Sequence, residues 1–406
     1  MRSRAKQIIF AIATSAAITT ARAQDVLLPT TSWGFVPVIA AWHFNTAING
    51  VADVAQVAVP FKVRFGLGGA WSMDLTGAYA SSAVHSSKSD SSSGNSGNSG
   101  SGGGDNLLML TGPTDLKVRV TGPIKGDALQ MTFGLNLPTG TTHLTSDQTA
   151  VLEAAGAPAL HMPVAAYGAG LGGTIGIVSA IERGDWAFAF GAAVEQRTEY
   201  TPIAIALSSG TSETQVTPGT ALHLSVGADR ALGEGRMGLL VIGDVFTKDK
   251  ISVGSGGSSS GSTSYTLGPQ LTALAKFDFA STHWRESGAS IAVRYRSAYT
   301  DANSVKVTGS DATYLEGTIG GVLGSANSAG FILAADARWH SGMPFTNALV
   351  GAAATAAGVT IGIESGGGGF RFALHPEYGS FSTGTAKTTG LGGSIVFSFA
   401  ARRGAQ

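Results

Sequence analysis

The sequence contains no cysteine, carries no net charge and is poor in charged residues altogether. Without cysteine there can be no disulfide, no thiolate metal site and no cysteine nucleophile. The 26 Lys and Arg residues balance the 26 Asp and Glu residues, and this balance argues against a nucleic-acid partner. Only 13% of the residues are charged, where a soluble domain has about a quarter. The chain must therefore hide apolar surface somewhere other than in one compact core.

Long hydrophobic runs and catalytic motifs are also missing. After the N-terminal region, no stretch approaches the roughly 18 consecutive apolar residues of a transmembrane helix. Gly168 to Gly173 match G-x-G-x-x-G, but a strand follows instead of a helix, which excludes a dinucleotide site. His85 and Ser86 lead into a low-complexity segment, which cannot hold a nucleophile and its base in place. We predict that the protein is not an enzyme and holds no cofactor and no metal ion.

The first residues have the pattern of a secretory signal peptide. A basic start is followed by a short apolar stretch over residues 8–20, and Ala21-Arg22-Ala23 supplies the small-x-small cleavage pattern. The apolar stretch is too short, and too rich in Ala, Thr and Ser, to anchor the chain as a membrane helix. We therefore predict a signal peptide over residues 1–23, cleaved between Ala23 and Gln24.

Apolar and polar residues alternate along most of the remaining chain. From Val57 to Phe65, the odd-numbered residues are Val or Phe, whereas Lys62 and Arg64 lie at even positions. Because successive side chains of a strand point to opposite faces, this period of two predicts a strand with one apolar and one polar face. The same pattern returns over residues 71–79, 116–120, 129–137, 186–197, 222–229, 276–279, 291–296, 331–340, 370–375 and 395–399.

The connections between these segments alternate in length. Short turns are predicted near Gly66, at Gly122-Pro123, and over residues 182–185, 232–235, 325–327 and 366–369. Long loops are predicted over residues 86–104, 139–165, 199–217, 251–264, 300–311 and 342–356. Short periplasmic turns and long external loops are typical of outer-membrane barrels. The sequence thus predicts an all-β fold, a transmembrane antiparallel up-and-down β-barrel in the outer membrane of a Gram-negative bacterium.

The barrel is predicted to span residues 51–399 and to have about 14–16 strands, with 12 also possible if weak segments fold inward. Residues 24–50 form either an N-terminal plug or the first strand, for which Val36 to Ile48 is the candidate. An even number of strands agrees with single-chain bacterial barrels. Residues 400–406 are predicted to form a periplasmic C-terminal extension.

Three loop segments differ in composition. Residues 86–104 are almost entirely Ser, Gly, Asn and Asp, which predicts a disordered external loop. Within the 139–168 loop, Thr145 and Gln148 have the spacing of a capping box that opens a short helix ended by Gly156. Residues 348–357 are a second apolar loop stretch. Apolar external loops either fold into the mouth and contact a hydrophobic ligand, or pack on themselves as a cap.

The alternation also predicts which charged residues face the lumen. Side chains of both signs on adjacent strands would form ion pairs that brace the wall, or a subset of them would line a narrow permeation path. Inward positions also include Leu240, Ile242 and Ile332, and a partly apolar lumen suits an uncharged or hydrophobic solute. The candidate lumen-lining residues are Lys62, Arg64, Asp74, Lys117, Arg119, Glu195, Arg197, Lys276, Arg294, Arg296, Asp336, Arg338 and Arg371.

Two short motifs carry a family resemblance. Residues 110–119 (LTGPTDLKVR) and 131–140 (MTFGLNLPTG) resemble segments of the outer-membrane barrels associated with the meta-pathway of phenol degradation. Those proteins show a Gly-Asp-Leu strand start, followed one hairpin later by Leu-Pro-Thr-Gly. Here Thr114 stands in place of the Gly, whereas residues 137–140 keep Leu-Pro-Thr-Gly. The family is similar to the long-chain fatty-acid transporters, which take up hydrophobic compounds.

The resemblance implies a plug role for residues 24–48 and a solute-capture role for the 139–165 loop. The chain departs from the family's ending, because residues 400–406 follow Phe399. The outer-membrane assembly machinery normally recognises a terminal aromatic residue, so an internal signal at Phe397 and Phe399 is expected.

These observations lead to one expected function and one alternative. We expect a monomeric channel in outer-membrane lipid that passes small hydrophobic or aromatic molecules by passive diffusion. The alternative is a closed, surface-exposed barrel with an adhesive or structural role through its external loops.

Overall fold

The computed structural model describes residues 33–401, except 69, 87–105, 126–127, 208–209, 234, 256–257, 280, 282, 325–327, 347, 367–368 and 385. The predicted signal peptide with its cleavage site at Ala23 and Gln24, nearly all of the predicted disordered loop, and residues 402–406 lie outside the described residues. The predictions for those segments stay predictions.

Two antiparallel sheets contain nearly all of the regular structure. In chain order the strands are β1 (Trp33–Phe35), β2 (Val38–Ile48), β3 (Val51–Gly68), β4 (Trp71–Ser86), β5 (Asn106–Pro113), β6 (Leu116–Lys125), β7 (Leu129–Leu137), β8 (Gly172–Arg183), β9 (Trp186–Arg197), β10 (Tyr200–Leu207), β11 (Gly210–Thr217), β12 (Ala221–Leu232), β13 (Gly235–Phe246), β14 (Lys248–Ser255), β15 (Ser258–Thr266), β16 (Gln270–Asp278), β17 (Trp284–Arg296), β18 (Ala312–Leu323), β19 (Gly330–His340), β20 (Ala353–Glu364), β21 (Phe370–Thr383) and β22 (Ala386–Ala401). The described helices are α3 (Ser146–Ala155) and the 3-10 turn η1 (Leu349–Gly351), and neither is long and apolar enough to cross a membrane.

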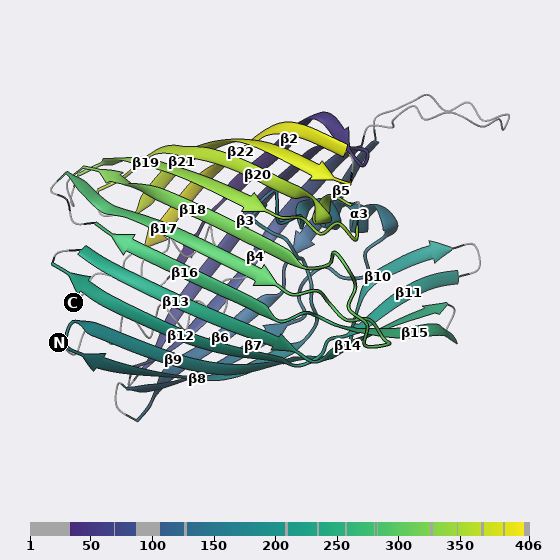
Figure 1. The fold of residues 1–406 in the computed structure, drawn as a ribbon, viewed down its shortest axis with the longest axis horizontal. Helices are drawn as coiled ribbons and strands as arrows, with labels where there is room; N and C mark the ends of the chain where they lie inside the picture. Colours follow the sequence, from purple (N-terminus) through teal and green to yellow (C-terminus); the bar gives the residue numbers. More distant parts are fainter. Residues whose placement is uncertain are drawn as a thin grey trace.

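The larger sheet closes on itself. β1 and β2 act as one wall strand, because both pair with β3 on one side and with β22 on the other. β5 and β6 likewise form one wall strand beside β4. The result is a closed antiparallel barrel of sixteen strands (Figure 1), which confirms the predicted fold class and the upper end of the predicted strand count.

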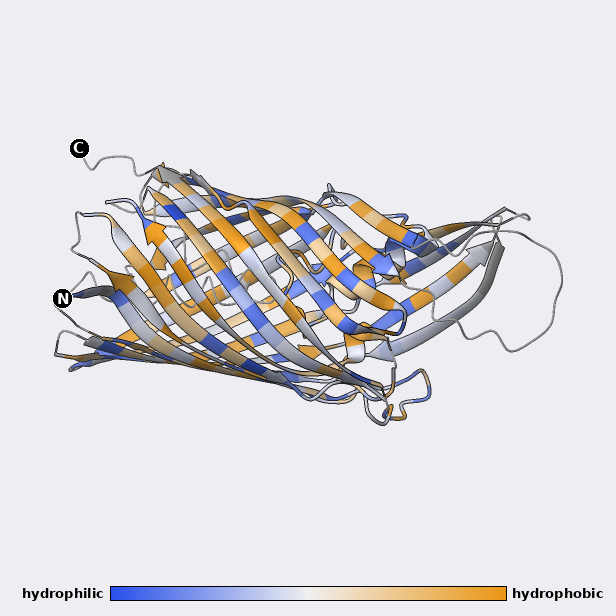
Figure 2. Cartoon of the chain, turned by 90° about the horizontal axis from the view of Figure 1, so that it is seen from above, coloured by the Kyte–Doolittle hydropathy of each residue, from blue (hydrophilic) through white to orange (hydrophobic). Residues whose placement is uncertain are grey.

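The alternating sequence pattern explains why this sheet closes with an apolar exterior. On β3, Val57 and Phe61 point outward and are 48% and 36% exposed, whereas Ala58 points inward and is fully buried. Figure 2 shows apolar and polar positions interspersed along the strands of the wall. A closed barrel whose outer face is apolar pairs all its backbone groups internally and presents hydrocarbon to lipid, which is the form in which β-strands cross a bilayer.

The segment from Val36 to Ile48, for which both a strand and a plug were considered, is a wall strand. It connects to β3 through Asn49 and Gly50, whose φ angles of +52° and +80° are those of a two-residue hairpin turn that favours Asn-Gly. This tight turn lies at the end of the barrel where most connections are long, so the predicted strict alternation of connection lengths is not observed here.

The predicted turn at Gly122-Pro123 is wrong, because β6 continues through both residues to Lys125. Gly122 does not reverse the chain but makes room for a side chain that packs against it. A Cβ atom at this position would lie 2.1 Å from Cδ2 of the Trp71 indole on the neighbouring strand, so only glycine leaves room for the ring. At the other end of the chain, Ala400 and Ala401 pair with β1, so β22 extends beyond Phe399 into the predicted extension.

Two of the predicted long loops are hairpins. β10 and β11 occupy most of the 199–217 segment, and β14 and β15 occupy the 251–264 segment. The two hairpins pair through β11 and β14 into a four-stranded sheet that projects beyond one end of the barrel (Figure 1). The sequence did not indicate strands there because β11, β14 and β15 are mostly polar, although Ile203 and Ile205 alternate with Ala on β10.

The outer wall can be tested with one substitution and an inward control. Val226, in the middle of β12, is 51% exposed on the outer face. We expect Val226→Lys to lower the free energy of unfolding in lipid vesicles by about 2–4 kcal/mol, because a charge would enter hydrocarbon. Thr132→Lys, which places the same side chain in the lumen cavity, should cost clearly less in the same denaturant titration. Equal losses for both variants would contradict the assignment of the two faces.

Candidate functional site

A long connection between β7 and β8 enters the barrel. We call residues 138–171 the inward loop. As predicted, Thr145 and Gln148 form a capping box: the Thr145 hydroxyl accepts from Gln148 N at 3.3 Å, and Thr145 N donates to Gln148 Oε1 at 3.1 Å. The cap starts α3, which ends at Gly156. Figure 1 shows α3 near β5, towards the end from which the hairpins project.

The apolar residues of the inward loop pack against the inner face of the wall. Val151 and Leu160 on the loop are at most 1% exposed and belong to one apolar cluster with Trp42 of β2 and Phe381 of β21. The second predicted apolar stretch, residues 348–357, is a loop only as far as residue 352, because β20 begins at Ala353. Its loop part joins the same cluster through Leu349, at the start of η1. Both stretches therefore fold into the barrel mouth, where their apolar side chains are buried in packing.

Hydrogen bonds to inward-facing side chains fix the middle of the loop. Trp42 Nε1 donates to the Leu160 carbonyl at 2.9 Å. The Gln56 amide makes a two-way contact with Val164, donating to its carbonyl at 2.8 Å and accepting from its N–H at 2.7 Å. Since Gln56 is 1% exposed, these bonds satisfy polar groups that would otherwise be buried without partners.

Tyr167 ties the end of the loop to two strands. Its hydroxyl lies 2.8 Å from the Ser82 hydroxyl and donates to the Leu110 carbonyl at 3.3 Å. Burial raises the pKa of Tyr167, so this hydroxyl keeps its proton and remains a donor. The loop is thus attached to the wall through side chains of β2, β3 and β4 and through the backbone of β5.

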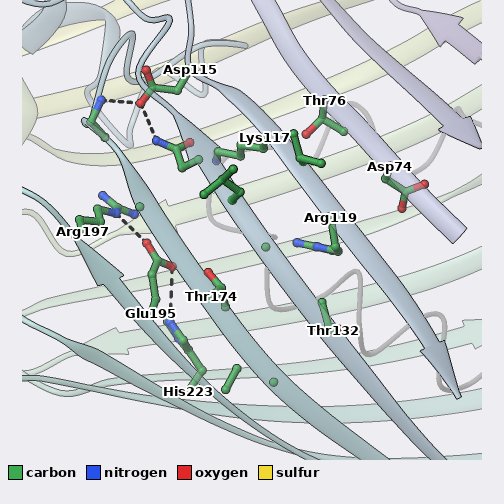
Figure 3. Close-up of a pocket in the computed structure, with 18 of the residues that line it drawn as sticks. Asp74, Thr76, Asp115, Lys117, Arg119, Thr132, Thr174, Glu195, Arg197 and His223 are labelled. Atoms are coloured by element: carbon green, nitrogen blue, oxygen red, sulfur yellow. Dashed lines mark hydrogen bonds and ion pairs between the residues drawn. The ribbon is translucent and has the colours of Figure 1, made fainter. Parts of the chain in front are cut away.

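Both ends of the inward loop are held by one carboxylate. Asp115 is 5% exposed, and its Oδ1 accepts from Gly140 N at 2.9 Å. Its Oδ2 accepts from Ala169 N and from Asn136 Nδ2, each at 2.7 Å (Figure 3). A Cβ atom on Gly140 would lie 2.6 Å from Asp115 Oδ1, so glycine is needed for this approach. We call these contacts the Asp115 clamp.

A bulge in the wall turns Asp115 inward. Ala80 pairs with Gly112 and Thr76 pairs with Lys117, so β5 and β6 contain one residue more than β4 between these pairs. Because of the extra residue, even-numbered side chains face the lumen on β5, whereas odd-numbered side chains face it on β6. The Thr139 hydroxyl accepts from Leu116 N at 2.9 Å in the same place. The two motifs that carry the family resemblance therefore contact each other at the clamp.

A cavity of about 380 Å³ lies beside the loop. Its walls are the inner faces of β3, β4, β6–β9, β12 and β13, and residues 163–169 of the inward loop close one side. Figure 3 shows charged side chains on β4, β6, β9 and β12, with Thr132 on β7 and Thr174 on β8 between them. The charged residues on the cavity wall, or paired to a residue there, are Lys62, Arg64, Asp74, Asp115, Lys117, Arg119, Glu195, Arg197, His223 and Asp244.

Positive charge prevails around this cavity. Five Lys and Arg side chains and His223 face four carboxylates, of which Asp244 lies 2.7 Å from His223 Nδ1. Two of the other carboxylates are engaged in ion pairs: Arg64 Nε lies 2.6 Å from Asp74, and Arg197 Nε lies 2.6 Å from Glu195. The fourth carboxylate, Asp115, is engaged by the N–H donors of the clamp. The electrostatic potential in the cavity therefore favours a negatively charged solute.

The other predicted lumen residues face inward on the opposite part of the wall. Arg338 is bound to Glu377, and Arg371 lies between Glu364 and Glu286. Arg296 contacts Met343 Sδ at 2.6 Å. The remaining three also have near neighbours: Arg294 lies over Tyr314, Asp336 lies 3.2 Å from His375, and Lys276 lies 2.9 Å from Asp278. The ion pairs among these contacts link neighbouring parts of the wall and stabilise it. A permeation role for these residues remains a prediction.

The sequence missed four acidic residues of the inner wall. Asp244 follows Ile242 by two residues, Glu377 follows His375 by two residues, and Asp115 precedes Lys117 by two residues, so extending the alternation by one position would have found all three. Glu364 lies on β20, where no alternation was identified in the sequence, and pairs with Arg371 on β21.

No known family model matches the chain, and no curated protein matches it. Solved structures similar to it include CdiB from Acinetobacter baumannii, with 10% identity, a TM-score of 0.41, and coverage of 91% of this chain and 60% of that one. An anion-selective porin from Comamonas acidovorans has 12% identity, a TM-score of 0.38, and 91% and 99% coverage. OccK2 (OpdF) from Pseudomonas aeruginosa has 9% identity, a TM-score of 0.34, and 92% and 98% coverage. Because these identities and TM-scores are low, the function is inferred from the residues of this chain and not from the similar structures.

The Asp115 clamp can be tested by removing its charge. In Asp115→Ala the N–H groups of Gly140 and Ala169 lose their acceptor, and each such loss of a buried partner costs about 1–3 kcal/mol. We expect faster hydrogen exchange in residues 140–169 while the barrel strands stay protected. Asp147→Asn, on the exposed first turn of α3, is the matched control. Unchanged exchange in the loop of Asp115→Ala would contradict the clamp.

Proposed function

We propose that the protein is a passive diffusion channel of the outer membrane of a Gram-negative bacterium, narrowed by its inward loop. A closed barrel with an apolar exterior and a charged interior supports this role. The observation that carries the proposal is the Asp115 clamp, which holds a loop inside the lumen next to a cavity rich in Lys and Arg.

The loop divides the lumen into two sides. One side is filled by the apolar cluster between the loop and β2–β5, β20 and β21. The other side is the cavity against β6–β9 and β12, where charged and hydroxyl side chains line the wall. A solute that crosses the barrel would pass along this second side, because the apolar cluster fills the first side.

The charge balance of the cavity supports small polar and anionic solutes as the cargo. The expected hydrophobic or aromatic cargo relied on a partly apolar lumen and on apolar loop residues as a capture surface, the role that the resemblance to the meta-pathway barrels implied for the 139–165 loop. Val151, Leu160 and Leu349 are buried in packing, so they are not available to bind a solute. Hydrophobic compounds therefore become the competing class in the uptake experiment below.

The four-stranded sheet of β10, β11, β14 and β15 favours a second candidate function. A sheet that projects beyond the barrel is a surface to which another molecule could bind, as the alternative of a closed adhesive barrel requires. Conductance in a planar bilayer separates the two candidates. Discrete channel steps support the channel, whereas their absence together with surface binding supports the alternative.

The cargo class is tested by reversing charge in one row of the cavity. Lys62 and Lys117 flank Thr76 in the same cross-strand row. We expect the wild-type protein to favour chloride over potassium in a salt gradient, and Lys62→Glu with Lys117→Glu to lower that permeability ratio by about threefold or more. Lys306→Glu, in the 300–311 connection, makes the same change of charge away from the cavity and should leave the ratio unchanged.

Liposome swelling with gluconate, glucose and benzyl alcohol completes the test. Faster protein-dependent entry of gluconate than of glucose supports the anionic preference. Protein-dependent entry of benzyl alcohol alone would restore the hydrophobic cargo and overturn our assignment.

A further inference from the structure

Three potential metal ligands converge on the inner wall away from the cavity. Asp336 on β19 and Glu377 on β21 both pair with Gly358 on the strand between them, so the two carboxylates flank a position without a side chain. The imidazole of His375 fills this gap. A Cβ atom on residue 358 would lie 2.6 Å from His375 Nε2, so the glycine is what allows the ring to lie between the carboxylates.

The spacing of the three ligand atoms fits a single ion. His375 Nε2 lies 3.2 Å from Asp336 Oδ1 and 3.0 Å from Glu377 Oε1, and one ligand atom from each residue lies within 4.8 Å of the others. Bonds of about 2.0–2.2 Å to zinc hold tetrahedral ligands about 3.3–3.6 Å apart, so the ligand atoms would move apart by a few tenths of an ångström to accept the ion. Nitrogen and carboxylate ligands together suit zinc and similar divalent transition metals more than calcium or magnesium.

Neighbouring residues orient two of the three ligands. Thr360 Oγ1 lies 2.7 Å from His375 Nδ1, and a proton on Nδ1 directed at this hydroxyl leaves the Nε2 lone pair pointing between the carboxylates. Arg338 orients Glu377 through both carboxylate oxygens, with Nη1 donating to Oε1 and Nη2 donating to Oε2 at 3.1 Å. Oε1 is the oxygen beside His375, so an ion bound there would share it with Arg338. Outer contacts of this kind fix the ligands of metal sites in proteins.

The local charge also favours a cation. Arg338 supplies one positive charge to the two carboxylates of Asp336 and Glu377, so the group is negative when His375 is neutral. The side chains of Asp336 and His375 are 14% and 19% exposed, which gives an ion access from the lumen. The charge of Arg338 opposes a second cation, so the affinity is expected to be moderate.

We propose that Asp336, His375 and Glu377 form a binding site for a divalent transition-metal ion of the zinc type in the lumen wall. The site is separate from the proposed channel cavity and does not depend on the channel function. A bound ion would lie between His375 Nε2 and the two carboxylates, and it would link β19 to β21 across Gly358.

The site is tested with the folded protein in detergent, prepared without a histidine tag. Titration with Zn²⁺ is followed by calorimetry, and Co²⁺ is used as a coloured probe of nitrogen and oxygen ligands. We expect one ion per chain, and about a tenfold or greater loss of affinity in His375→Asn and in Asp336→Asn. Heat-dependent gel mobility and circular dichroism show whether each variant keeps the barrel.

His223 supplies the matched control. It also has two carboxylate neighbours, but Asp244 lies 2.7 Å from Nδ1 and Glu195 lies 3.7 Å from Nε2, on different ring nitrogens. The two carboxylates therefore cannot share one ion with this ring, and His223→Asn should bind Zn²⁺ like the wild type. Absence of one-to-one uptake by the wild-type protein, or equal affinity in His375→Asn, would overturn the proposal and leave an ion-pair network that braces the wall.

Discussion

The pairing of every wall strand with two neighbours is the constraint on which the rest of the structure depends. Inside a bilayer no water is available to the backbone, so the row of N–H and C=O groups on an edge strand would lack partners. The contact of β1 and β2 with β22 removes both edges. Once the ring is closed, the period of two along each strand assigns every side chain to lipid or to lumen, and the charged residues collect inside.

Closure creates an interior that a single layer of side chains does not fill. The inward loop occupies part of this space, with Leu160 and Val151 packed on Trp42 from the first wall strand. The loop must also satisfy its own backbone groups, and the inner wall supplies partners through Gln56 and Asp115. The remaining interior keeps its charged residues hydrated or paired. The division into a packed side and a polar side thus follows from where the loop finds hydrogen-bond partners.

Features set by periodicity could be predicted from the sequence, and features set by packing across strands could not. The faces of Val57 to Phe65 and the helix at Thr145 follow from local patterns, and the structure confirms both. Gly122 looked like a turn residue, because its role depends on the Trp71 ring of another strand. The hairpins at 199–217 and 251–264 were not predicted, because three of their four strands are mostly polar and pair with each other outside the barrel.

The bulge beside Asp115 couples the register of the wall to the position of the loop. Without the extra residue, even-numbered side chains would face the lumen on β6 as they do on β5, and Lys117 and Arg119 would point into lipid. The same irregularity turns the Asp115 carboxylate towards Gly140 and Ala169. One insertion therefore places basic residues in the lumen and also holds the loop that confines a solute beside them. A change of register at this point would alter both features at once, so the charge of the cavity and its width are set by a single local departure from regular strand geometry.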